Sequence, residues 1–121
     1  MMSKSARSVF VFGLYLGVLG IALLVVPNVL LGMFFLPSTT EVWIRVVGML
    51  TLFLGFYYTQ AARKELTDFI RWTLYPRSSV IIFCAIFVLL DFAKPPMILF
   101  GIIDLAGVIW TALALRSPKT A

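Results

Sequence analysis

The sequence predicts an all-α polytopic membrane protein, a four-helix bundle with both termini in the cytoplasm. Of its 121 residues 62% are apolar and only 12% are charged, and its mean hydropathy is +1.07, far from the values of an ordinary soluble domain. Long apolar segments alternate with short polar or proline-containing turns, and basic residues gather in alternate connections. Four spans of about 20 residues use nearly the whole chain, so we expect one transmembrane domain, residues 1–121.

The expected spans are residues 8–36, 41–63, 68–92 and 96–116. The first is longer than a bilayer crossing requires and contains Pro27, so we expect a kink or break there. Thr39 or Thr40, in the turn that follows, is expected to cap the second helix. The apolar stretch between Arg77 and Asp91 holds only 13 residues, about 20 Å at the helical rise, so the third span must begin near residue 67 or 68.

The distribution of basic residues predicts the orientation of these spans. Eight of the ten lysines and arginines fall on one side of the four-span arrangement, and this excess marks the cytoplasmic side. We therefore expect a multi-pass protein of the inner (cytoplasmic) membrane, with membrane lipids and not nucleic acid as the partners of its +5 net charge. The eight residues are Lys4, Arg7, Arg63, Lys64, Arg71, Arg77, Arg116 and Lys119, whereas Arg45 and Lys94 lie on the other side.

Several classes of chemistry are excluded by composition. The chain contains no histidine and one cysteine, so it lacks the residues for histidine acid–base catalysis and for histidine or multi-cysteine metal sites. No cofactor and no metal are expected. An enzyme would have to act through Asp, Arg and Tyr side chains alone, and the sequence argues against one.

The sharpest candidate site is Asp104, which lies about 12 Å from the start of the last helix and about 18 Å from its end. We expect it to face the bundle and to meet Arg45, which could also pair with Glu41 one helical turn earlier. Such a pair could fix the helix register, or it could belong to a proton or ligand site with Tyr15 and Tyr57 on its walls. Both interpretations stay open.

A second candidate is a binding site for a lipid head group. Arg63, Arg71 and Arg77, with Gln60 and Tyr75 nearby, could form a basic pocket that faces the cytoplasm. Ordinary positive-inside charge is the alternative interpretation.

Glycines recur on the first two helices. Gly13 and Gly17 have the G-x-x-x-G spacing, Gly20 follows, and Gly48 and Gly55 are seven residues apart. Such faces allow helix backbones to approach closely. Packing within one chain is the expected use, and homodimerisation is the alternative.

The second helix contains W-I-R-V-V-G over residues 43–48, G-F-Y-Y over 55–58 and A-A-R over 61–63. In these motifs it resembles the R-x-x-G helix of small DoxX-like four-helix membrane proteins. Members of that group are linked with quinone-coupled oxidation or with scaffolding of other membrane enzymes, so the resemblance implies a partner protein or an apolar ligand. We therefore expect an accessory or scaffold subunit that binds another membrane protein or a second copy of itself. The alternative is a lipid-, quinone- or small-molecule-binding or transport module with an intramembrane Asp/Arg site.

Overall fold

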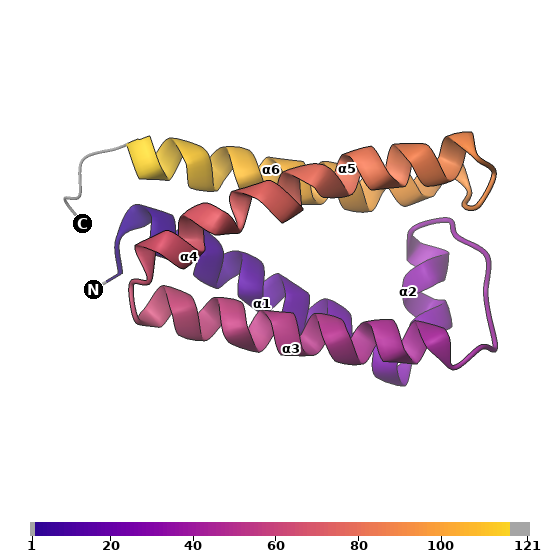
Figure 1. Ribbon diagram of the computed structural model, residues 1–121. Coiled ribbons are helices and arrows are strands. Elements are labelled where there is room, and N and C mark those ends of the chain that lie inside the picture. The colour runs from indigo at the N-terminus through magenta and orange to yellow at the C-terminus, as the bar shows by residue number, and fades with distance from the viewer. Residues whose placement is uncertain (1, 117–121) are drawn as a thin grey trace.

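The computed structural model describes residues 2–116, and within this range every regular element is a helix (Figure 1). The all-α prediction is confirmed, while Lys119 lies outside the described residues. The elements are α1 (Lys4–Val25), α2 (Pro27–Met33), α3 (Trp43–Arg63), α4 (Thr67–Trp72), α5 (Leu74–Leu89), the short 3-10 helix η1 (Pro95–Met97) and α6 (Ile98–Arg116).

Three stretches of the described chain are long and apolar enough to cross a membrane: Lys4–Val25, Thr67–Leu89 and Pro95–Arg116. The third helix in chain order, α3, is 21 residues long but is less apolar, because Arg45, Gln60 and Arg63 lie within it. It nevertheless packs along α1 more extensively than any other two elements pack together.

The helices form two pairs, which α1 connects. Helix α1 packs against α3, α5 packs against α6, and α1 also contacts α6. Figure 1 shows α1 passing from the α4–α6 side, where it begins, to a position beside α3, where it ends. The start of α1 therefore lies between α3 and the α5–α6 pair (Figure 1). The buried core lies around this half of α1.

The first segment, predicted as residues 8–36 with a kink or break at Pro27, is broken at that proline into α1 and α2. Helix α1 begins earlier, at Lys4, because the Ser3 hydroxyl accepts a hydrogen bond from the Ala6 N–H at 3.2 Å. It ends at Val25 because Pro27 has no N–H and its ring excludes the carbonyl four residues earlier. The same proline then opens α2 as its first residue.

The connection from α2 to α3 is fixed by a side chain and not by the expected helix cap. Helix α3 begins at Trp43, after an N-cap residue, Val42, that makes no side-chain cap bond. The prediction that Thr39 or Thr40 caps this helix is wrong: the Thr39 hydroxyl instead accepts the Glu41 N–H at 3.1 Å. Asn28 holds the loop to α2 by donating to the Thr39 carbonyl at 3.0 Å and accepting the Thr39 N–H at 2.8 Å.

We expect Asn28→Ala to lower the free energy of unfolding by about 1 kcal/mol, because it removes two exposed hydrogen bonds of modest net value. Asn28→Asp keeps the acceptor for the Thr39 N–H and loses only the donor, so its loss should be about half as large. Amide hydrogen exchange at Thr39 measures the effect directly. Unchanged protection of this amide in Asn28→Ala would contradict the role of the loop contact.

The third span begins at Thr67, as predicted, and is broken at Thr73 into α4 and α5. Pro76 causes the break, since it can neither donate a backbone hydrogen bond nor accommodate the Trp72 carbonyl. The Thr73 hydroxyl donates to the Ile70 carbonyl at 2.6 Å and so satisfies one acceptor near the break. The change of direction at Thr73 precedes Arg77 by one helical turn.

Glycines of α1 and α3 meet in a close antiparallel contact, as the sequence predicted for packing within one chain. A Cβ on Gly20 would lie 2.6 Å from the Leu52 backbone nitrogen, and a Cβ on Gly55 would lie 2.7 Å from the Gly13 carbonyl oxygen. Gly48 likewise faces the Gly20 carbonyl oxygen, at 2.8 Å. We call these four residues, Gly13, Gly20, Gly48 and Gly55, the glycine seam.

Candidate functional site

The structure does not bring Arg45 to Asp104. Arg45 is exposed, and its guanidinium donates to the Leu24 carbonyl at the end of α1. Within residues 2–116 Arg45 forms no salt bridge with Asp104 or with Glu41, which is also exposed. The expected pairing is therefore wrong, because the Leu24 carbonyl of α1 is the acceptor that Arg45 contacts.

Tyrosine 58, and not Tyr57, faces the core. Tyr57 is 59% exposed and contacts only the neighbouring Phe56 ring among the aromatic contacts of the described chain. Tyr58 is buried and packs on Phe12 and Phe69, at ring-centroid distances of 6.0 and 5.7 Å. The expectation that Tyr57 lines an internal site is therefore wrong by one residue, which is about 100° around a helix.

Arg77 is the most unusual residue of the core. Only 2% of its surface is exposed, although its neighbour in the sequence-predicted basic pocket, Tyr75, lies at the surface. The guanidinium carbon lies 4.7 Å from the centre of the Phe12 ring, a cation–π contact. The expected cytoplasm-facing pocket of Arg63, Arg71 and Arg77 does not form, because the break at Thr73 turns Arg77 inward.

Buried hydroxyl groups connect Arg77 to α1 and α6. Its Nη2 donates to the Thr111 hydroxyl at 2.8 Å, and the Thr111 and Ser8 hydroxyl oxygens are 2.7 Å apart. The Ser8 hydroxyl donates to the Ser5 carbonyl at 2.7 Å. Since each hydroxyl has one proton, Thr111 must donate to Ser8, and the bonds run in one direction from the guanidinium to the start of α1.

This chain of hydrogen bonds leaves part of Arg77 unsatisfied. Its Nε and Nη1 are buried and have no hydrogen-bond partner in the described protein, and the hydroxyl oxygen of Tyr15 is in the same state. A buried donor without an acceptor costs about 1–3 kcal/mol, and more when it is charged. Three such atoms therefore lie in one core.

Asp104 supplies the opposite charge. It is partly buried on α6, and its carboxylate interacts electrostatically with Arg77 and with Tyr15. Gly107, one turn further along α6, leaves room for this arrangement: a Cβ there would lie 3.0 Å from the Phe12 ring and 3.5 Å from Arg77 Nη1. We call Ser8, Phe12, Tyr15, Arg77, Asp104 and Thr111 the polar core site.

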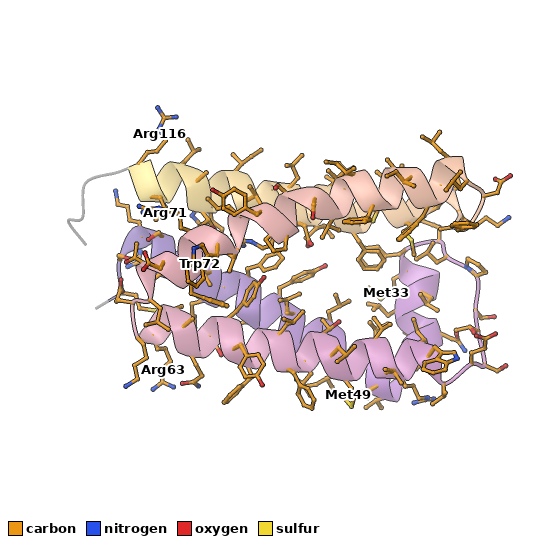
Figure 2. The ribbon with its side chains drawn as sticks, viewed as in Figure 1. Met33, Met49, Arg63, Arg71, Trp72 and Arg116 are labelled. Atoms are coloured by element: carbon orange, nitrogen blue, oxygen red, sulfur yellow. The ribbon has the colours of Figure 1, made fainter. Side chains whose placement is uncertain are left out.

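The other predicted head-group residues lie at the surface. Arg63 and Arg71 are exposed, and Figure 2 shows both, with Arg116, at the end of the molecule where α3 and α6 end. Arg71 and Arg63 come from different elements, α4 and α3. Only Arg63 lines one of the surface grooves described below.

The candidate residues predicted from the sequence include Asp104, Tyr15 and Arg77. They do not include Ser8, Thr111, Phe12 and Tyr58. A serine and a threonine in apolar helices are common, and their hydroxyls can bond to the helix's own carbonyls. The available signal was the intramembrane arginine itself, because a buried guanidinium needs several acceptors. Which hydroxyls supply them depends on helix rotation, which hydropathy alone leaves open.

Comparison of the chain with protein-family models, with curated proteins and with solved structures finds no match.

Proposed function

We propose that the chain is a small multi-pass protein of the cytoplasmic membrane that binds a small, acceptor-bearing molecule at the polar core site. The observation that supports this most strongly is the Arg77 guanidinium, which is buried with Nε and Nη1 unpartnered. A carbonyl or carboxylate oxygen would complete its hydrogen bonding, and the Tyr15 hydroxyl offers a further donor.

The proposed topology has four crossings, with both ends of the chain in the cytoplasm. Helix α3 crosses the membrane in addition to the three more apolar spans. The gathering of Arg63, Arg71 and Arg116 at one end supports the orientation (Figure 2). The extensive packing of α3 along α1 supports a position of α3 within the membrane, beside α1. The likeness of α3 to the DoxX-like helix agrees with a ligand of the quinone or lipid class, and such a ligand would also carry the oxygen acceptors that Arg77 lacks.

Native mass spectrometry of protein released gently from its own membrane tests this proposal. We expect one defined small molecule per chain, and we expect Arg77→Met to lose it. Arg45→Met is the matched control, because it removes an exposed arginine by the same substitution and should retain the ligand. Tyr15→Phe removes a single buried hydroxyl and should weaken retention where Tyr57→Phe does not. Wild-type protein without any bound molecule, or equal retention in Arg77→Met, would contradict the proposal.

An accessory or scaffold subunit is the second candidate function. Its support is the sparse internal packing of the last two spans: only 17% of the most apolar window of Thr67–Leu89 and 11% of that of Pro95–Arg116 are buried within the chain, against 33% for α1. Helices that bury so little of their own surface have room to pack on another polypeptide. The same experiment separates the two functions, because a second polypeptide at a fixed ratio would favour the subunit.

A further inference from the structure

The outer side of the α1–α3 pair carries one continuous groove. Its first part has a volume of about 780 Å³ and is lined by residues such as Phe10, Leu14 and Arg63. Its second part, of about 630 Å³, is lined by residues such as Gly17, Val18 and Phe53. Leu14 and Thr59 line both parts, so the two parts join.

The groove is polar at one end and apolar at the other. Gln60, Arg63 and Glu65 line the first part, at the end of the molecule where α1 begins and α3 ends. The second part has glycines and large apolar side chains and little polar surface. From Arg63 to Phe53 the helix rises about 15 Å, which is about half of a 30 Å hydrocarbon core. The distance along the groove from Arg63 at its polar end to Phe53 at its apolar end therefore matches the depth of one leaflet.

The polar end has one cation, Arg63, and one anion, Glu65. One Glu65 carboxylate oxygen already accepts the Ser3 N–H at 2.7 Å, so this acid is engaged with the start of α1. Arg63 forms no salt bridge within residues 2–116. Its exposed guanidinium can bind a phosphate in a bidentate manner, and the Gln60 side chain lines the same end of the groove.

Gly17 keeps the apolar end open. A Cβ at this position would meet nothing within 4 Å, unlike the four residues of the glycine seam. The Gly17 backbone lies against Gly55 in the contact between α1 and α3, but its own Cβ position faces away from α3. This leaves a shallow channel between Val18 and Phe53. An acyl chain fits such a channel, since it needs apolar walls and no hydrogen bonds.

From this geometry we propose that the groove binds one phospholipid, with its phosphate at Arg63 and Gln60 and one acyl chain along Leu14, Gly17 and Phe53. This site is separate from the polar core site, which involves none of these residues. The charged rim and the leaflet-deep apolar channel fit an amphiphile better than a partner helix, which would place backbone and not charge at Arg63.

The test uses delipidated full-length protein titrated with dioleoyl-phosphatidylglycerol and followed by native mass spectrometry. We expect one tightly retained lipid per chain and at least fivefold weaker retention of dioleoylglycerol, which has the same chains and no phosphate. Arg63→Gln should weaken phosphatidylglycerol binding at least fivefold. Arg71→Gln, an exposed arginine at the same end but on α4 and away from the groove lining, is the matched control and should bind as wild type.

Gly17→Leu tests the acyl channel independently of charge. The leucine fills open space, so we expect normal folding with at least fivefold weaker lipid retention. Inorganic phosphate should not displace the lipid at millimolar concentration. The proposal is overturned if Arg63→Gln or Gly17→Leu retains lipid like wild type, if Arg71→Gln loses as much as Arg63→Gln, if phosphate alone competes, or if the groove is covered by a second copy of the chain.

Discussion

Replacing Gly20 with alanine is expected to destabilise the protein by about 2–3 kcal/mol, whereas the same substitution at Gly17 is expected to be neutral or slightly stabilising. The added methyl group on Gly20 would lie 2.6 Å from the Leu52 nitrogen and 2.7 Å from the Gly48 carbonyl oxygen. Both neighbours are backbone atoms, so the contact can be relieved only if α1 and α3 move apart, and over-packing of this kind costs about 1–3 kcal/mol.

Gly17 provides a control on the same helix, three residues away. Its methyl group meets nothing within 4 Å, and alanine is the better helix former by about 1 kcal/mol. Reversible unfolding in mixed micelles, titrated with a denaturing detergent, gives both free energies. Equal effects at the two positions would show that helix propensity, and not the glycine seam, controls stability here.

The second large effect is expected at Arg77. Arg77→Met should lower the free energy of unfolding by about 3 kcal/mol, because it leaves the Asp104 charge without its counter-charge in an apolar surrounding and removes the bond to Thr111. Asp104→Leu alone should also destabilise, since it leaves the guanidinium unbalanced. The double substitution should recover part of the loss, with a coupling energy of at least about 1 kcal/mol.

The same unfolding assay gives this double-mutant cycle. Arg77→Lys is an informative third variant, because it keeps the charge but cannot reproduce the planar group stacked on Phe12. We expect it to lie between wild type and Arg77→Met. Additive effects of Arg77→Met and Asp104→Leu would show that the two side chains do not act as a pair.

Hydropathy and the positions of prolines and polar turn residues were sufficient to predict the helical class and the positions of most turns. Pro27 ended the first helix and the third span began at Thr67, as the sequence indicated, because proline chemistry and span length act locally. The glycine seam was also predictable from spacing alone. These features depend on residues close together in the chain.

The partners of the buried charges could not be predicted in the same way. Arg45 and Asp104 were matched by their depth along two helices, yet depth says nothing about rotation around each helix axis. In the structure Arg77 is the cation that acts electrostatically on Asp104, although no salt bridge joins the two within residues 2–116. Pro76 breaks the span and turns the following residues inward. The one-residue exchange of Tyr57 for Tyr58 has the same origin.

The directed bonds from Arg77 through Thr111 and Ser8 to Ser5 have a consequence for cooperativity. They connect α5 through α6 to α1, three helices that lie far apart in the sequence. Separation of any one of these helices leaves buried hydroxyl or guanidinium groups of the other two without partners. The three helices should therefore unfold as one unit.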